Sequence, residues 1–202
     1  MFRCFSINLH KIIIVCSGAS SEGFTPPEDC TVIAVNNTIN WLSRADYFFT
    51  LDPIFHELFN PENRREGVEY CIAFPRKFPN CTMYDRITDT SETAVHGHTG
   101  TMKGKRGLSD NGISNGNSAY GALNLAYLFG FDKLVFIGLD AGGKRHKSEK
   151  HPEHPKEYIH LKELFDSALE QVKGRVINAS PKSKLGTFPK MNHQDAMEWL
   201  FS

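Results

Sequence analysis

The chain has 202 residues, of which 40% are hydrophobic and 23% are charged, as in an ordinary soluble globular protein that can bury a core. Its 23 basic and 23 acidic residues give a formal net charge of zero, which disfavours a general surface for nucleic acid, membrane or another polyanion. No stretch approaches the roughly 18 to 20 apolar residues that span a bilayer. We therefore expect one cytoplasmic domain over residues 1–202.

The start of the chain contains a short apolar run that ends in KIIIVCSGAS. His10 and Lys11 interrupt the run, so the pattern favours a first strand leading into a turn over a signal peptide. The five cysteines are odd in number and form no CxxC pair. This disfavours a disulfide framework and a structural zinc site, and it favours thiols that act as small hydrophobic side chains.

Short apolar segments alternate with helical patterns along the chain. The predicted strands are mostly continuous and rich in β-branched or aromatic residues, which is typical of strands covered on both faces; they lie at 11–16, 31–35, 46–51, 70–74, 133–138 and 174–178. The predicted helices lie at 39–45, 53–59, 117–129, 156–173 and 193–201. This alternation predicts an α/β fold: a single Rossmann-like domain with a mainly parallel central sheet and helices on both faces.

Two polar segments interrupt this rhythm. The first, at about 86–116, is glycine-rich and too long for an ordinary connection, which indicates a functional lid or disorder. Its KGKRG sequence could contact a phosphate or form a solvated loop tip. The second is a His-rich loop at about 141–156, directly after the strand that ends near Asp140.

Because ligands of parallel α/β sheets bind beyond the carboxyl ends of the strands, polar residues that follow strands are site candidates. Ser17, Gly18 and Ser20 follow the first strand; small residues there allow close backbone approach, and a following helix N-terminus would attract phosphate. A tight strand-to-helix turn explains them equally well, since the sequence is neither GxGxxG nor a P-loop. Asn36 and Asn37 follow the second strand and could cap a helix or contact a ligand.

The predicted buried helix at 117–129 begins with Asn117 and Ser118, and Asn115 precedes it. One cap explains one polar residue but not all of them, so a ligand contact is a second hypothesis. The His-rich loop holds three candidates for proton transfer near neutral pH: His146, His151 and His154. Metal binding is the rival hypothesis, although no HExxH motif or nearby cysteine supports zinc.

Five stretches together resemble a known group of proteins: IIIVCSGASSE, TVIAVNNTINWLSRADYFFTLD, GNSAYGALNLAYLFGFDKLVFIGLD, the His-rich loop and RVINASPKSKLGTFP. Their order and spacing resemble small phage and prophage proteins of the sialyltransferase-like type. More distantly, the chain resembles the bacterial sialyltransferases of glycosyltransferase family 42 and the domain-of-unknown-function 115 group, which contains an archaeal pterin pyrophosphokinase. The resemblance spans residues 12 to about 189.

The resemblance implies a role for most of the candidates. The turn at Ser17 and Gly18 and one of Asn36 and Asn37 would contact a sugar nucleotide. By the same resemblance, Ser118 would hold the cytidine phosphate. His151 or His154 would be the general base, and the C-terminal motif would bring Asn178, Ser180 and Ser183 toward the nucleotide. The first turn departs from the Asn-Gly-Pro-Ser of the sialyltransferases.

The main hypothesis is a glycosyltransferase-like enzyme that uses a CMP-sugar or another nucleotide sugar, needs no metal and transfers to an acceptor that the sequence does not identify. The predicted nucleotide-binding set is Ser17, Gly18, Ser20, Asn36, Asn37, Asn117, Ser118, Asp140 and Ser180. One alternative is a pyrophosphokinase-like enzyme with Mg²⁺ held by Asp52 and Asp140. Another is a non-catalytic nucleotide-binding phage accessory protein. The oligomeric state stays open.

Overall fold

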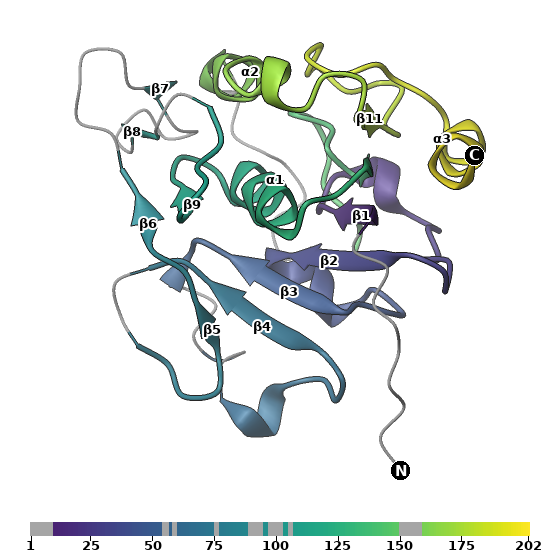
Figure 1. The fold of residues 1–202 in the computed structure, drawn as a ribbon. Helices are drawn as coiled ribbons and strands as arrows, with labels where there is room; N and C mark the ends of the chain where they lie inside the picture. The colour runs from purple at the N-terminus through teal and green to yellow at the C-terminus, as the bar shows by residue number, and fades with distance from the viewer. Residues whose placement is uncertain are drawn as a thin grey trace.

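The protein is an α/β structure built on a seven-stranded parallel sheet with the strand order β11-β10-β1-β2-β3-β4-β5 (Figure 1). The computed structural model describes residues 10–53, 57, 60–74, 77–88, 95–96, 103–104, 107–149 and 159–202. The strands are β1 (Lys11–Val15), β2 (Thr31–Val35), β3 (Tyr47–Thr50), β4 (Glu69–Ile72), β5 (Thr82–Met83), β10 (Lys133–Ile137) and β11 (Val176–Asn178). The predicted Rossmann-like α/β fold is confirmed.

All six predicted strands are present, because each is a continuous apolar run that the sheet buries on both faces. In β1, for example, Ile12 and Ile14 belong to one hydrophobic cluster and Ile13 and Val15 to the other. The seventh strand, β5, was not predicted. Its two residues lie at the sheet edge and are exposed, so they carry no apolar signal.

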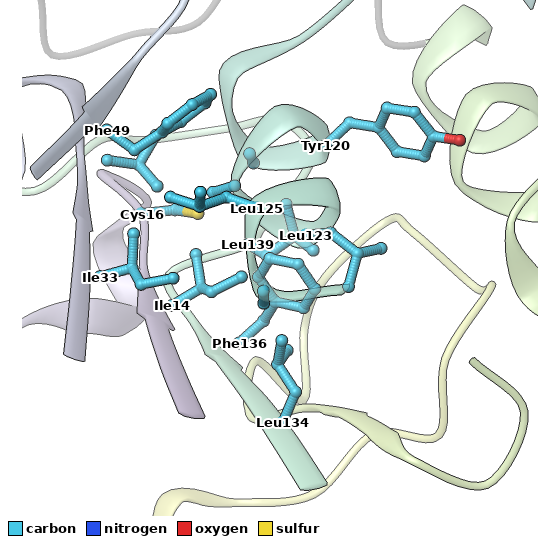
Figure 2. Close-up of a cluster of buried hydrophobic side chains, with 14 of the residues drawn as sticks. Ile14, Cys16, Ile33, Phe49, Tyr120, Leu123, Leu125, Leu134, Phe136 and Leu139 are labelled. Carbon is cyan, nitrogen blue, oxygen red and sulfur yellow. The ribbon is translucent and has the colours of Figure 1, made fainter. Parts of the chain in front are cut away.

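Helices cover both faces of the sheet, as predicted. On one face lie α1 (Ser118–Phe129), α2 (Ile159–Asp166) and the 3-10 turn η5 (Leu169–Gln171), and the core cluster of this face contains side chains of α1 and α2. Figure 2 shows Leu123 and Leu125 of α1 packed near Ile14 and Phe136 of the sheet. On the other face, α3 (His193–Phe201) contributes its buried residues to the second cluster. No helix among the described residues is long and apolar enough to span a membrane.

The segment at 86–116 contains four short strands, which corrects the prediction of a structureless loop. β6 (Arg86–Ile87) pairs in parallel with β9 (Ile113–Ser114), and β7 (Val95–His96) pairs antiparallel with β8 (Lys103–Gly104). The end of the segment packs against α1, where the fully buried amide of Asn124 accepts hydrogen bonds from the backbone N–H groups of Ser109 (2.9 Å) and Ser114 (3.0 Å). A side-chain amide thus satisfies polar backbone that could not otherwise be buried. Parts of the segment, including Lys105 and Arg106 of KGKRG, lie outside the described residues.

Two predicted helices are shorter than expected. The helix expected at 39–45 is the 3-10 helix η2 (Asn36–Asn40), because Asn36 takes a left-handed conformation with a φ of 54° and Thr38 Oγ1 bonds back to Val35 O at 3.0 Å. The helix expected at 156–173 is broken between α2 and η5, where Ser167 Oγ donates to the carbonyl of Leu164 at 2.6 Å. Such side-chain bonds compete with the helical ladder. Residues 150–158 and most of the helix predicted at 53–59 lie outside the described residues; η4 (Pro61–Asn63) follows the latter.

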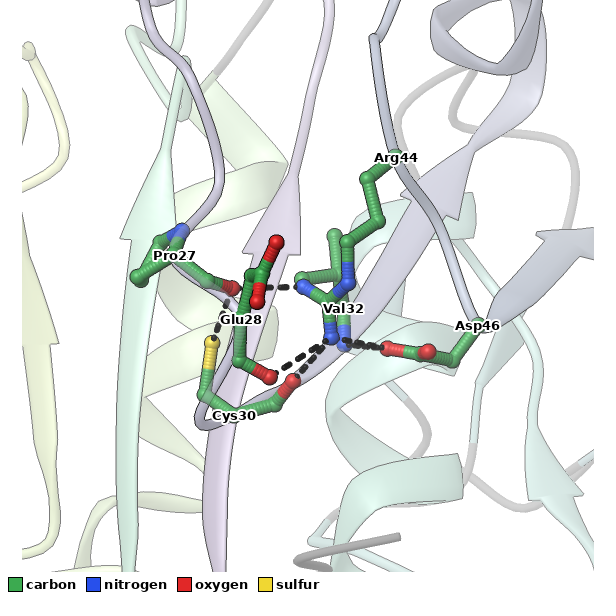
Figure 3. A network of polar contacts seen from close by, with 6 residues as sticks. All are labelled: Pro27, Glu28, Cys30, Val32, Arg44 and Asp46. Atoms are coloured by element: carbon green, nitrogen blue, oxygen red, sulfur yellow. Dashed lines mark hydrogen bonds and ion pairs between the residues drawn. The ribbon is translucent and has the colours of Figure 1, made fainter. Parts of the chain in front are cut away.

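A polar network ties the amino ends of β2 and β3 together (Figure 3). The guanidinium of Arg44 donates to the carbonyls of Pro27 (2.7 Å) and Cys30 and to Asp46 Oδ2 (3.0 Å), which also accepts from Val32 N at 2.8 Å. All of these donors and acceptors bond to one another, so the network serves the structure of this region. This network therefore fixes the edge of the sheet opposite to the one where ligands of such folds bind.

The four cysteines that the structure describes are free thiols, as the sequence predicted. They are Cys16, Cys30, Cys71 and Cys81, and the first three are buried. Burial raises the pKa of Cys30 to about 11 and raises the pKa of Cys16 and Cys71 as well. Neutral, buried thiols pack as small hydrophobic groups.

Candidate functional site

The topology places the candidate site where β1 and β10 lie side by side. From β1 the chain adds β2 to β5 on one side of the sheet and then crosses back to add β10 and β11 on the other. The carboxyl ends of β1 and β10 therefore form the topological switch point, which is where ligands bind in open α/β sheets. The segments that follow β1, β10 and β11 all begin at this end of the sheet.

Three predicted residues meet at the switch point. The carboxylate of Asp140 accepts hydrogen bonds from the backbone N–H of Ser20 (3.0 Å) and from the Ser20 hydroxyl. The Ser20 hydroxyl also lies 2.7 Å from the hydroxyl of Ser180, which is buried. Next to them Asn178 donates to the carbonyl of Leu139 at 3.1 Å, while its buried Oδ1 has no partner. A water molecule or a ligand group usually meets such a buried acceptor.

The glycine turn after β1 packs against the turn after β10. A Cβ on Gly18 would lie 2.4 Å from the carbonyl oxygen of Gly138 and 2.6 Å from Asp140, so the glycine is needed for this close approach. The N–H groups of Gly18 and Ala19 donate to Gly138 O (3.0 Å) and Lys144 O (3.1 Å). The helix that follows, η1 (Ala19–Ser21), has only three residues. The turn thus has an internal structural purpose, and its contact with a phosphate stays a prediction.

A second polar cluster joins the ends of β2 and β3 to the start of α1. Asn36 Nδ2 donates to Asp52 Oδ2 at 3.3 Å, and Thr50 Oγ1 donates to Asn36 Oδ1 at 2.7 Å. The Ser118 hydroxyl donates to the same Asp52 oxygen at 3.1 Å. Burial lowers the pKa of the Arg86 guanidinium, and the negative charge of Asp52 opposes this shift. Asp52 is therefore the centre of this cluster.

Asn117 and Ser118 have different roles at the head of α1. Asn117 is the N-cap, and its Oδ1 accepts from the N–H groups of Ala119 (2.8 Å) and Tyr120 (3.3 Å). Ser118 is buried and links β3 to α1. Asn115, also buried, has a side-chain oxygen without a partner. The cap that the sequence suggested is confirmed for Asn117, and the ligand role of these residues stays a prediction.

The segment 141–149, which we call the strap, crosses the carboxyl end of β1. Its Lys144 carbonyl accepts from Ala19 N at 3.1 Å, and His146 N donates to the carbonyl of Ser17 at 2.7 Å. The strap is the described part of the predicted His-rich loop. His151 and His154 lie outside the described residues, so their role as general base stays a prediction.

The strap continues to the end of β2. The ring of His146 stacks on Trp41 with a centroid distance of 3.8 Å and an interplanar angle of 5°. Asn37, from the predicted site, donates to Glu149 Oε2 at 3.1 Å. Trp41 Nε1 and Glu149 Oε1 are buried polar atoms without a partner. Asn37 therefore holds the strap in this structure.

His146 is 5% exposed, and burial lowers its pKa. Its Nδ1 accepts a hydrogen bond from the backbone N–H of Ser148 at 3.2 Å. A neutral imidazole with Nδ1 as acceptor carries its proton on Nε2 and offers no free lone pair. This arrangement favours a structural role for His146 over the predicted role as proton acceptor.

The structure adds a histidine that the sequence analysis did not select. His193, the first residue of α3, is half-buried, forms a hydrogen bond with the backbone of Ser20 and lies edge-on to Phe24 at 5.5 Å. Burial lowers its pKa, and the charge of Asp140 opposes the shift. Nothing in the sequence around His193 marks it as functional, because its position depends on where the chain returns after β11.

Lowering the pH below about 6.5 is expected to reduce the free energy of unfolding. Burial lowers the folded-state pKa of His146 and His193 below the ordinary value of 6.5, so the unfolded chain takes up these protons first as the pH falls. Their contribution is complete above pH 6.5 and is lost as the pH falls through their folded-state pKa values. Urea denaturation at several pH values between 5 and 8 measures the slope.

The His146→Phe variant is the control for this prediction. Phenylalanine keeps an aromatic ring on Trp41 but cannot take up a proton. We expect a shallower loss of stability with falling pH in this variant. An unchanged slope would show that His146 does not contribute.

Asp52 and Asp140, the two carboxylates of the magnesium hypothesis, belong to different clusters. They follow β3 and β10, which are separated by β1 and β2 and so by three strand spacings of about 4.8 Å each. Within the described ranges, no group of three or more His, Cys, Asp or Glu side chains is arranged to hold a metal ion. The two aspartates therefore do not share one ion in this arrangement.

Comparison with known proteins supports the fold. No protein-family model matches the sequence, and a search of curated proteins finds no match. A solved structure, that of the MAf glycosyltransferase from Magnetospirillum magneticum AMB-1, matches with a TM-score of 0.57 at 13% sequence identity. The match covers 98% of this chain and 37% of that chain, so this chain spans well under half of the other protein. At this identity the likeness shows a shared fold; it does not support a sialyltransferase specificity or a phage origin.

Proposed function

We propose that this protein is a glycosyltransferase-like enzyme that binds a nucleotide sugar at the carboxyl edge of its sheet. The observation that carries the proposal is the pair of polar clusters beyond the strand ends, one around Asp140 at the switch point and one around Asp52 beside α1. The side chains of these clusters carry hydroxyl, amide and carboxylate groups, which can form hydrogen bonds with the hydroxyl groups of a sugar or a ribose. The shared fold with a glycosyltransferase supports the same class of reaction.

In the proposed reaction an acceptor hydroxyl oxygen attacks the anomeric carbon of the donor. The bond from that carbon to the phosphate oxygen breaks, the nucleotide leaves with the bonding electrons, and a histidine takes the acceptor proton. His151 and His154 are the bases that the sequence suggested. His193 is a further candidate, because it lies beside the Ser20 backbone and burial lowers its pKa, which favours the neutral imidazole that can accept a proton. A CMP-sugar is the first donor to test.

Binding of nucleotide sugars tests the proposal. Thermal-shift and calorimetric titrations with CMP-, UDP- and GDP-sugars are expected to find one donor that raises the melting temperature of the protein. Ser118→Ala and Ser180→Ala each remove a hydroxyl from one of the two clusters and are expected to weaken that binding by about tenfold. Thr82→Ala, which removes an exposed hydroxyl at the sheet edge, is the matched control.

The outcomes separate three cases. If no nucleotide sugar binds the protein, the proposal is wrong. Binding without hydrolysis or transfer of the sugar would reduce it to a nucleotide-binding protein. If the donor is turned over, alanine variants of His151, His154 and His193 identify the base, whose loss typically costs a hundredfold or more in rate.

A further inference from the structure

Basic residues gather on two segments beside the switch point. The strap, residues 141–149, and the connection at 181–190 together hold six basic residues and one acidic residue, in a chain whose net charge is zero. The strap directly follows β10, and the connection follows β11, the neighbour of β10 in the sheet. Positive charge is therefore concentrated at the carboxyl edge next to Asp140.

Lys184 lies beside the switch point. Its backbone N–H donates to the carbonyl of Asp140 at 2.9 Å. Its side chain passes over Gly142: a Cβ on that glycine would lie 3.2 Å from Lys184 Cδ and 3.5 Å from its Nζ. Because Gly142 has no side chain, the lysine stem can lie across the strap with its ammonium group beside the switch point.

Three of the four other exposed lysines on the same segments join Lys184 in the argument: Lys144, Lys182 and Lys190. Lys190 Nζ donates to the carbonyl of Ser183 at 2.5 Å, which holds this charge at the connection. None of these four lysines forms an ion pair with an acidic residue that the structure describes. The oxygens of Asp140, the carboxylate at the switch point, accept hydrogen bonds from Ser20. The positive charge of the four lysines is thus available to a ligand.

The backbone amides of two places that often hold phosphate in such folds, the turn after β1 and the head of α1, already have acceptors in the protein. The N–H groups of Gly18, Ala19 and Ser20 donate to acceptors of the protein itself. At the head of α1, Asn117 Oδ1 accepts from the N–H groups of Ala119 and Tyr120. A phosphate beside these two places would therefore be held better by side-chain cations than by their N–H groups.

We propose that Lys184, with Lys144, Lys182 and Lys190, binds the phosphate groups of an anionic ligand at the switch point. The ligand class is a phosphate or pyrophosphate ester. The phosphate site is argued from the lysines alone. Only the other parts of the ligand, its nucleoside and its sugar, rest on the proposed function. An ammonium group is a compact charge that binds phosphate without the fixed geometry of a guanidinium.

Inorganic pyrophosphate is the probe that tests the site. Isothermal titration calorimetry of the whole chain is expected to show binding that weakens as the salt concentration rises. Lys184→Gln is expected to weaken it by about tenfold, the usual cost of one charge-assisted contact. Lys173→Gln is the matched control, because this lysine is 72% exposed and pairs with Glu170, which is also exposed. An unchanged melting temperature of Lys184→Gln shows that the variant is folded.

The results distinguish this inference from the proposed function. If the wild-type protein does not bind pyrophosphate, or if both variants weaken binding equally, the lysine site is wrong. If a nucleotide sugar binds with the same affinity to the wild type and to Lys184→Gln, the inference fails and the proposed function stands. If pyrophosphate binding depends on Lys184 but no nucleotide sugar binds, the phosphate site stands and the proposed function fails.

Discussion

Substitution of Gly138 by alanine is expected to lower the free energy of unfolding by about 3 to 5 kcal/mol. Gly138 has a left-handed conformation with a φ of 73°, which costs any other residue energy. In addition, a Cβ at this position would lie 2.2 Å from the carbonyl oxygen of Cys16 and 3.0 Å from Ser21 Cβ. The first of these atoms belongs to the backbone, so no side-chain rotation relieves the contact.

The backbone around this contact has little freedom to move. Cys16 N donates to the carbonyl of Ile137 at 2.8 Å, and Gly18 N donates to the carbonyl of Gly138 at 3.0 Å. Separating the two chains enough for a methyl group would break these hydrogen bonds. It would also pull Ser20 away from Asp140, so the variant is expected to lose the cluster at the switch point as well as stability.

Gly174→Ala is the matched control. This glycine has a nearly identical φ of 74°, and a Cβ there would meet no atom within 4 Å. We expect a cost of only about 1 kcal/mol, the conformational cost alone. Urea denaturation of the two variants measures the difference. Equal losses in both would mean that the close approach of β1 and β10 contributes nothing to stability.

The strands of the sheet could be predicted from the sequence, because a strand that is buried on both faces consists of a continuous run of apolar residues. Each of the six predicted strands is such a run, and the rule that parallel strands end at one edge then brought Ser20 and Asp140 to the same place. The polar residues after the strands do form clusters. The candidate site was therefore predictable as a location.

The partners within the site were not predictable, because they depend on contacts between distant segments. Ser20 and Ser180 are 160 residues apart, and which hydroxyl faces which follows from strand order. The same holds for His193, which reaches Ser20 only because α3 begins beside the switch point. The helix cap was easier to predict, because it involves only neighbouring residues. Asn117 accepts hydrogen bonds from the N–H groups two and three positions later in the chain.

The short strands and buried residues of the polar segment before α1 were not predictable, for a related reason. Its polar and glycine-rich composition is typical of a solvated loop, yet Leu108, Ser109 and Ser114 are buried. The side-chain amide of Asn124 forms the hydrogen bonds that the buried backbone of this segment needs. Asn124 lies in the middle of an apolar helix, and a single polar residue there does not indicate such a role in the sequence. Its hydrogen-bond partners lie ten and fifteen residues earlier in the chain.

Asn124→Ala is therefore expected to lower the free energy of unfolding by about 3 to 6 kcal/mol. The fully buried amide accepts from Ser109 N and Ser114 N and donates to Ser109 O at 2.9 Å, and alanine would leave all three backbone groups without a partner. Each buried group left unpaired costs about 1 to 3 kcal/mol. Urea denaturation measures the loss, and hydrogen exchange of the Ser109 and Ser114 amides should show it locally.

Gln171→Ala tests whether burial sets the size of this loss. Gln171 makes the same kind of amide pair with one residue, accepting from Leu108 N at 2.6 Å and donating to Leu108 O at 3.1 Å, but its side chain is only half-buried. Water can replace a half-buried amide, so a cost of about 1 kcal/mol is expected. If Asn124→Ala costs no more than Gln171→Ala, the segment before α1 is held by its apolar contacts, and the amide of Asn124 is not what allows it to be buried.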